Sequence, residues 1–318
     1  MTCERWAVTG AAGYLGSYVV EQLLARGTAV LAVDDVSTGR EAHLAPHLGN
    51  PNFTWAKQDI RAADALAALF RDHKPTVVVH LAALHFIPAC NANPPLTISV
   101  NVHGTQSVLS AAKAGGAERF YLASTGDVYK PDETPHHETE SVVGAFGIYG
   151  LSKLICEQLV GLESKQRPDA RFVVGRLFNL VGPRETNPHF LPEVLEQLRN
   201  NPDAVLRLGS LWPKRDLVPI ADAAKAIIAL LDAATPGVTT VNVASGAAVS
   251  MQEVLDHLSV IRGEPLTIET DPAKVRPVER GHLQANVARL KSLIGFTPHT
   301  DVKRTLAELW AAEGPKAG

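Results

Sequence analysis

Tyr149 and Lys153 are the residues of this sequence whose types and spacing most directly suggest chemistry. Residues four apart lie on the same face of a helix, so the phenol and the ammonium are expected to be neighbours. A nearby ammonium favours the phenolate, and we therefore expect Lys153 to lower the pKa of Tyr149, so that the tyrosine exchanges a proton near neutral pH. The same spacing occurs on solvated helix faces, and the prediction gains weight from Ser124, Thr125 and a glycine-rich turn upstream.

The glycine-rich turn comes directly after the first apolar segment. Residues 5–9 have the composition of a short buried strand, and Gly10, Gly13 and Gly16 follow before an apolar helical pattern begins. Glycines let the backbone approach a pyrophosphate closely, and the N-terminus of the next helix favours its negative charge. Strand, turn and helix together predict a dinucleotide-binding site; a tight turn without a ligand is the alternative.

Acidic residues follow the next two strands of the pattern. Residues 29–33 form the second strand, which ends in Asp34 and Asp35. An acid at this position can accept hydrogen bonds from the adenosine ribose and repels a 2′-phosphate, which favours NAD over NADP. A third strand follows, and Asp59 with Ile60 after it suits either the adenine ring or the start of a helix.

Strands and helices alternate over residues 5–176, which predicts an α/β fold with a doubly wound parallel sheet. Residues 76–80 form an apolar strand, as a sheet covered on both faces requires. Ligands of such sheets bind at the carboxyl ends of the strands, where Ser124 falls. Residues 81–83 would then pass under the cofactor, and the loop from His85 would open into the pocket.

The pattern changes after residue 177, where prolines and short segments become frequent. Two helices are expected at about 220–233 and 250–261, with a strand between them. This alternation is similar to that of the first domain, so the chain is expected to return to it. We therefore assign residues 1–181, with 216–261 returning, to an NAD-binding domain. Residues 182–215 and 262–318 are assigned to a smaller C-terminal α/β substrate lobe.

Composition excludes several classes of protein. The 318 residues are 46% apolar and 20% charged, enough to bury a large core. A net charge of -3 argues against a nucleic-acid surface, and no apolar run is long enough to span a membrane. The odd, widely spaced Cys3, Cys90 and Cys156 indicate a reducing, cytoplasmic location and no metal cluster.

Short motifs along nearly the whole chain resemble those of the extended short-chain dehydrogenase/reductases that act on nucleotide sugars, the UDP-glucose 4-epimerase-like family. The order of the motifs, more than any single one, carries the resemblance. They are residues 9–16 (TGxxGxxG), 34–40 (the adenosine segment), 80–83 (HxAA), 101–105 (NxxGT), 124–129 (S-[ST]-xx-VY), 149–153 (YxxSK), 176–184 (RxxN and GPR), 215–222 (RDxVxxxD), 276–279 (similar to RPGD) and 295–298 (similar to GWxP).

The resemblance implies a Rossmann-type domain and bound NAD. The implied cofactor contacts are Gly10, Gly13, Tyr14, Leu15, Gly16, Asp34, Asp35, Ser37, Thr38, Gly39, Asp59, Ile60, Leu81, Ala82, Ala83, Asn101, Ser124, Tyr149 and Lys153. It also implies a homodimer formed through the helices that carry Asn101 and Tyr149.

The implied substrate is a nucleotide sugar, with a UDP-sugar favoured. Asn179 would contact the diphosphate, Arg215 and Arg276 suit bidentate phosphate binding, and Glu279 could hold a ribose hydroxyl. For each arginine a surface ion pair is the alternative. The full set of implied substrate contacts is His85, Phe86, Thr125, Asn179, Arg184, Arg215, Arg276 and Glu279.

The implied chemistry passes through a 4-keto sugar. Tyr149 would take the proton of the sugar 4-hydroxyl while hydride passes from C4 to the nicotinamide, and Lys153 would hold the nicotinamide ribose. Thr125 would hydrogen-bond the same sugar oxygen. Return of hydride to the opposite face gives a 4-epimer, whereas the ketone also permits 4,6-dehydration or, with a C6 carboxylate, decarboxylation.

Residues 125–127 bear on the choice among these reactions. Dehydratases of the family place Thr-Asp-Glu here and decarboxylases Thr-Ser-Glu, but this chain has Thr125-Gly126-Asp127. Gly126 cannot protonate a leaving hydroxyl, and Asp127 is either a shortened base or a turn cap. We therefore expect a 4-epimerase, with Thr125, Tyr149, Lys153 and Asp127 as its candidate catalytic residues. A dehydratase or decarboxylase using Asp127 is the alternative, and a non-enzymatic NAD sensor is a further one.

Overall fold

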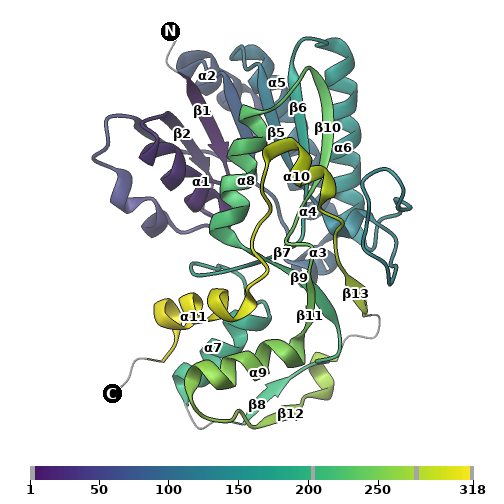
Figure 1. Ribbon diagram of the computed structural model, residues 1–318. Coiled ribbons are helices and arrows are strands. Elements are labelled where there is room, and N and C mark those ends of the chain that lie inside the picture. Colours follow the sequence, from purple (N-terminus) through teal and green to yellow (C-terminus); the bar gives the residue numbers. More distant parts are fainter. Residues whose placement is uncertain (1–3, 202–204, 276–278, 316–318) are drawn as a thin grey trace.

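The computed structural model describes residues 4–201, 205–275 and 279–315 (Figure 1). Its main feature is a seven-stranded, wholly parallel sheet in the order β10-β6-β5-β4-β1-β2-β3, which confirms the predicted fold class. The strand order reverses between β1 and β4, where open parallel sheets bind their ligands. The strands are β1 (Arg5–Thr9), β2 (Ala29–Asp34), β3 (Phe53–Lys57), β4 (Val77–His80), β5 (Arg119–Thr125), β6 (Arg171–Leu177) and β10 (Gly237–Val243).

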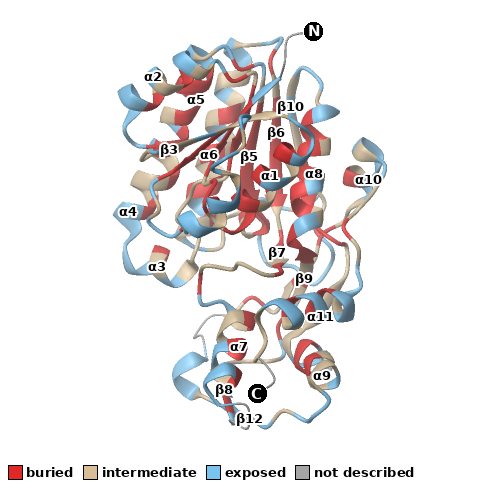
Figure 2. Ribbon diagram, turned by 90° about the vertical axis from the view of Figure 1, so that its left-hand side faces the viewer, coloured by how far each residue is buried: buried red, intermediate tan, exposed pale blue. Residues whose placement is uncertain are grey.

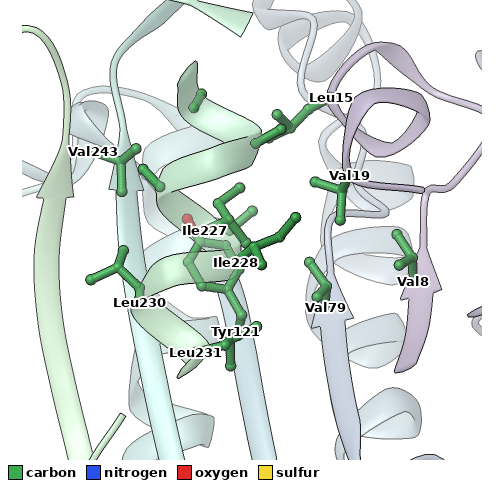
Figure 3. Close-up of a cluster of buried hydrophobic side chains, with 14 of the residues drawn as sticks. Val8, Leu15, Val19, Val79, Tyr121, Ile227, Ile228, Leu230, Leu231 and Val243 are labelled. Carbon is green, nitrogen blue, oxygen red and sulfur yellow. The ribbon is translucent and has the colours of Figure 1, made fainter. Parts of the chain in front are cut away.

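Helices cover both faces of this sheet, so its central strands are buried on both sides. Figure 3 shows one interface, in which Val8 and Val79 from the sheet meet Val19 of α1 and Ile227 of α8. The opposite face packs on a second apolar cluster formed with α2, α5 and α6. The helices are α1 (Tyr14–Ala25) and α8 (Ile220–Asp232) on one face, and α2 (Ala63–His73), α5 (Gly104–Ala114) and α6 (Ile148–Gln166) on the other.

The connection from β4 to β5 brings loop residues to the end of the sheet. The helix expected to carry Asn101 is present but changes geometry along its length, because a π-helical segment, η3, separates α4 from α5. A π segment inside a helix often marks a functional site. The parts are α3 (Ile87–Ala92), α4 (Pro94–Ile98) and η3 (Ser99–His103), and the chain has single 3₁₀ turns at η1 (Glu41–His43), η2 (Ala45–His47), η4 (Gly126–Val128) and η5 (Pro272–Lys274).

A smaller lobe lies beyond the carboxyl ends of the strands (Figures 1 and 2). Two apolar clusters hold it together, one joining Leu195, Val254 and Leu306 and the other joining Leu198 and Leu258. Its elements are α7 (Phe190–Asn200), β8 (Leu206–Leu208), α9 (Met251–Arg262), β12 (Ile268–Thr270) and α11 (Val302–Glu313), with a small sheet of β7 (Asn179–Val181), β9 (Lys214–Pro219), β11 (Ala248–Ser250) and β13 (His282–Leu283) between the two lobes.

Packing differs from the division drawn on the sequence at two helices. Helix α9, which was assigned to the first domain, contacts α11 and contributes Val254 to the core of the smaller lobe. Helix α10 (Ala288–Ile294), which was assigned to the lobe, packs on β10 and α8 of the large domain. Both are amphipathic, and sequence alone does not say which surface an apolar face meets. In the part of the chain that the structure describes, no helix is long and apolar enough to cross a membrane.

Candidate active site

A cavity of about 1010 Å³ runs along the carboxyl ends of the strands and is closed on its other side by the smaller lobe. It extends from the glycine turn after β1, past Tyr149, to α7 and β9. Its size matches the upper end of small-molecule and cofactor sites. Most of the residues predicted to bind ligand therefore lie around a single continuous space.

The glycine turn forms one end of the cavity. Gly10 has φ 72°, and a Cβ there would lie 2.7 Å from the backbone nitrogen of Ala82. A Cβ on Gly16 would overlap the carbonyl oxygen of Gly10. Gly13 begins α1 without any side-chain cap, so the first amides of the helix are available to an anion. Gly10, Gly13, Tyr14, Leu15 and Gly16 all line the cavity.

Asp34 and Asp35 lie where the adenosine ribose was expected, but both carboxylates also organise their own loop. Asp34 accepts hydrogen bonds from the backbone nitrogens of Val36 (2.8 Å) and Ala12 (3.0 Å), while burial raises its pKa. Asp35 is exposed and accepts from the nitrogen and hydroxyl of Ser37. Ser37 and Thr38 line the cavity, whereas Gly39 packs against Ala12 and is not among the lining residues.

The remaining predicted cofactor residues are divided between the cavity wall and the layer behind it. Asp59 and Ile60 line the wall, and Asp59 is held by Arg61 at 2.6 Å. Leu81, Ala82 and Ala83 also line it. Asn101 is 1% exposed and is not a lining residue.

Asn101 instead ties the wall together from behind. Its side chain accepts from the nitrogen of Leu84 (2.8 Å), and its amide donates to the carbonyl of Leu84 (2.9 Å) and to the hydroxyl of Ser152 (2.9 Å). Asn101 therefore positions the loop after β4 against helix α6. The direct cofactor contact expected from the sequence does not fit this buried position.

Tyr149, Lys153 and Thr125 lie together at the end of β5, and all three line the cavity. Thr125 and Lys153 are buried, and Tyr149 is partly exposed. The expected lowering of the tyrosine pKa is wrong for the chain on its own. Burial and then the Asp127 carboxylate raise the pKa of Tyr149 above its ordinary value, against a hydrogen bond from Thr125 that lowers it. Burial also lowers the pKa of Lys153, which weakens its ammonium as a partner.

Ser124 is fixed by a buried ion pair behind the same strand. Its hydroxyl donates to Glu157 of α6, which is bound through both oxygens by Arg176 at 3.0 and 2.7 Å. The Arg176 guanidinium also lies 4.7 Å from the ring centre of Tyr129, a cation–π contact. These contacts join α6 to β5 and β6 just below Tyr149.

Asp127 forms an ion pair with Arg280, which the sequence did not single out. The Arg280 guanidinium donates to the Asp127 carboxylate at 3.1 Å, to the carbonyl of Gly126 at 3.3 Å and to Nε2 of His136 at 2.9 Å. His136 in turn stacks on Tyr129 with ring centres 4.6 Å apart. Asp127 and Arg280 both line the cavity, so an arginine of the C-terminal segment reaches the part of the cavity that contains Tyr149.

The lobe side of the cavity carries other predicted substrate residues. Arg215 binds Glu279 at 3.0 Å and the carbonyl of Arg280 at 2.8 Å, and both members of the ion pair line the cavity. Asn179 also lines it. Arg276 lies outside the described residues.

Arg184 is the predicted substrate contact that the structure places elsewhere. It is not among the lining residues, and its guanidinium binds Glu21 at 2.8 Å and lies over the ring of Tyr18. Its backbone has φ 73°, and its nitrogen donates to Glu313 of α11. The left-handed backbone sends the side chain back toward α1, which local sequence does not reveal.

A group of polar residues next to His85, formed by Asn187, Glu185 and His189, was not predicted from the sequence. The amide of Asn187 donates to Nε2 of His85 at 3.0 Å, and Glu185 lies 3.3 Å from Nδ1 of His189, whose ring is near Phe86. His85, Phe86, Glu185 and His189 line the cavity. Burial acts to raise the pKa of Glu185, but His189, the backbone nitrogen of Asn187 and His85 together outweigh it, and the pKa is lowered. The four-residue spacing of Glu185 and His189, directly before an apolar helix, was the available signal.

Fold and site together define a dinucleotide-dependent enzyme built on a doubly wound sheet. The model of the NAD dependent epimerase/dehydratase family matches residues 6–244, and the chain belongs to this family. Its cofactor is NAD, and the uncapped helix α1, the close-packed glycines and the acidic end of β2 fit that dinucleotide.

Similar proteins carry several activities. GDP-6-deoxy-D-mannose reductase of Pseudomonas aeruginosa is 28% identical, with 95% of each chain covered. UDP-glucose 4-epimerase of Rhizobium meliloti is 27% identical, also with 95% of each covered. UDP-glucuronic acid decarboxylase 2 of Arabidopsis thaliana is 29% identical over 95% of this chain and 66% of its own. The structure of Thermus thermophilus UDP-glucose 4-epimerase with NAD has a TM-score of 0.84 at 26% identity, covering 97% of this chain and 98% of that one.

Proposed function

We propose that the protein is an NAD-dependent nucleotide-sugar 4-epimerase with a UDP-sugar as its substrate. The observation that carries the proposal is the group of Tyr149, Thr125 and Lys153 at the end of β5, in one cavity with the glycine turn. The names of two similar proteins, both UDP-glucose 4-epimerases, support the substrate class.

In the proposed reaction Tyr149 accepts the proton of the sugar 4-hydroxyl and later returns it. NAD, when bound, supplies the acceptor and donor of hydride for C4. Thr125 hydrogen-bonds the oxygen that Tyr149 deprotonates, and Lys153 provides a buried positive charge one helical turn away. Because burial keeps Tyr149 protonated in the chain alone, ionisation of the phenol depends on this charge and on the bound ligands.

Two features favour epimerisation over loss of water or carbon dioxide. Gly126 offers no acid for a leaving hydroxyl, and it is tightly packed, because a Cβ there would lie 3.2 Å from both Leu283 and Phe178. The carboxylate of Asp127 is engaged by Arg280 rather than poised alone as a base. A decarboxylase is nevertheless the second candidate, since one similar protein bears that name and Asp127 lines the cavity.

The test is the mass and chromatographic identity of products from UDP-glucose, UDP-N-acetylglucosamine, UDP-glucuronate, dTDP-glucose and GDP-mannose without added cofactor. We expect a new species of unchanged mass. Tyr149→Phe should reduce turnover by roughly 10²–10⁴-fold with NAD retained. Tyr18→Phe removes the hydroxyl of a tyrosine on α1 that does not line the cavity; it is the matched control and should retain turnover.

A product that has lost water or carbon dioxide would mean that the protein is a lyase and not an epimerase. Retained NAD with no turnover of any sugar, and full biological activity of Tyr149→Phe, would favour an NAD sensor instead. Either result would leave the family assignment intact.

We also propose a homodimer formed through η3–α5 and α6. Leu151 and Leu162 of α6 are 45% and 56% exposed, whereas Leu154 and Leu159 of the same helix pack on the two sheet cores. Exposed leucines on one helix suit a partner surface. A molar mass of twice 34.0 kDa in solution, reduced to one chain by Leu151→Glu with Leu162→Glu, is the expected result.

A further inference from the structure

Arg280 is a buried cation of the C-terminal segment that faces the turn after β5. Its side chain is 3% exposed. One terminal nitrogen donates to the Asp127 carboxylate (3.1 Å) and to the carbonyl of Gly126 (3.3 Å), and the other donates to Nε2 of His136 (2.9 Å). Its Nε has no partner among the described residues. A buried guanidinium with one unpaired donor costs stability, so packing alone does not explain its position.

The groups around Arg280 make Asp127 its charged partner within the described residues. Burial and then the Arg280 charge lower the pKa of His136 to about 4, so this imidazole is neutral and accepts through Nε2. Gly126 contributes only a carbonyl. Because a guanidinium stays protonated and Asp127 is its ion-pair partner, the two side chains together add no net charge to the site.

Asp127 is held beside Tyr149 by its backbone. Its nitrogen donates to the Thr125 hydroxyl (3.2 Å), and its carbonyl accepts from the nitrogen of Phe146 (3.0 Å). A Cβ at Gly150, the residue after Tyr149, would overlap this carbonyl oxygen and lie 3.4 Å from the Cβ of Asp127. The η4 turn and helix α6 therefore touch here, and the carboxylate cannot move far from the phenol.

Asp127 and Lys153 are the charged side chains next to the phenol, and they act on it in opposite directions. The ammonium favours the phenolate, whereas the carboxylate opposes it. After burial, Asp127 is the largest cause of the raised pKa of Tyr149. The other titratable groups around the phenol and the ammonium are neutral at neutral pH, because burial raises the pKa of the thiols and lowers that of the imidazoles: Cys90, Cys156, His80 and His85.

We infer that Arg280 is a positioning residue of the reaction, which cancels the charge of Asp127 beside Tyr149 and so lets Lys153 govern the ionisation of the phenol. The inference rests on the proposed function, in which Tyr149 is the base. Arg280 acts through Asp127 and requires no contact with the substrate. The C-terminal segment thereby contributes to proton transfer as well as to the wall of the cavity.

The test follows the ionisation of Tyr149 by the tyrosinate absorbance of the NAD-loaded protein, with Tyr149→Phe as the spectral blank. Arg280→Met leaves the Asp127 charge uncompensated and should move the midpoint of this titration up by about one pH unit, a tenfold smaller phenolate fraction at lower pH. Asp127→Asn removes the opposing charge and should move the midpoint down by about one pH unit. The double variant lacks a neutral pair and should return to within about half a pH unit of wild type.

The pH profile of kcat/KM with UDP-glucose should move in the same way. Because the phenolate is the active form, Arg280→Met should lose about tenfold below the wild-type midpoint and recover as the pH rises through its own midpoint. Arg280→Lys keeps the positive charge and should keep the wild-type midpoint. Arg304→Met is the matched control, because it removes an exposed cation from α11 and should not change the midpoint.

An unchanged midpoint in Arg280→Met, or shifts of the same direction in Arg280→Met and Asp127→Asn, would overturn the inference. Lost turnover without any movement of the pH profile would do the same, since a purely structural role predicts that result. If Arg280→Met does not fold, Asp127→Asn must still lower the midpoint and the double variant must raise it again. The titration needs no substrate, so the expected midpoints in a protein that epimerises no sugar would refute the proposed function alone.

Discussion

Asp34 at one end of the cavity and Asp127 at the other are held in place by different kinds of contact. At the adenosine end, Asp34 is bound by backbone nitrogens of Ala12 and Val36, both within 22 residues in the chain. At the reaction end, Asp127 is bound by Arg280, 153 residues away. The adenosine end is thus a local structure, whereas the reaction end exists only when distant segments meet.

Substitutions at the two ends of the cavity should therefore act differently. A local loop keeps its geometry whatever the smaller lobe does, which suits a cofactor site shared across a family. A site assembled from β5, α6 and the C-terminal segment can change its charges by substitution in any one of them. Substrate choice is therefore expected to depend on the reaction end, and changes at the two ends should have separable effects.

The largest expected effect comes from the ion pair behind the reaction end. Glu157→Gln leaves the Arg176 guanidinium buried without its counter-charge; the two side chains are only 10% and 7% exposed. Breaking such a pair destabilises by about 3–5 kcal/mol. Denaturant unfolding should show this loss, together with weakened turnover because the acceptor of the Ser124 hydroxyl loses its charge.

The control is Glu308→Gln, which breaks the exposed pair with Arg304 on α11. It should leave stability nearly unchanged, as exposed pairs usually do. Similar losses from both substitutions would mean that the Glu157–Arg176 pair does not act as a buried support.

A smaller effect is expected at the adenosine end. Gly16→Ala forces a methyl group onto the Gly10 carbonyl oxygen, and neither backbone segment can yield easily. We expect a loss of about 1–3 kcal/mol in the unfolding free energy of the NAD-free protein, as for other overpacked sites. Weaker NAD binding should accompany it.

Gly13→Ala is the control for this position. Its Cβ would lie 3.1 Å from the same oxygen, so a small shift accommodates it. Unfolding of the NAD-free protein should change much less than for Gly16→Ala. Equal losses from both would indicate that the turn is looser than its packing suggests.

The sequence predicted the adenosine end well for the same reason that this end is local. Strand, glycine turn and acid lie within one stretch, and their order determines the sheet and its switch point. The hydrogen bonds of two residues could not be predicted, however. Asn101 and Asp34 have the expected positions, but their side chains form hydrogen bonds with the backbone of the protein.

The reaction end was only half predictable. Tyr149 and Lys153 were found because their spacing has chemical meaning, and Thr125 through the resemblance to the family. The pKa of Tyr149, however, depends on burial and on Asp127, which spacing does not encode. Arg280 was missed because nothing near it in the chain points to residue 127. Arg184 was misplaced because a positive φ reversed the direction of its side chain.

The smallest predicted effect concerns strain at the adenosine end. Val36 has φ 62°, a conformation that a β-branched residue rarely adopts, and its nitrogen is held there by Asp34. Val36→Gly and Val36→Ala both remove the side-chain contacts, but only glycine removes the backbone strain. We expect the glycine variant to be the more stable of the two by about 1 kcal/mol, measured by denaturant unfolding. Elsewhere alanine normally exceeds glycine in stability, so an alanine variant of equal or greater stability would mean that the loop relaxes and that Asp34 does not impose its conformation.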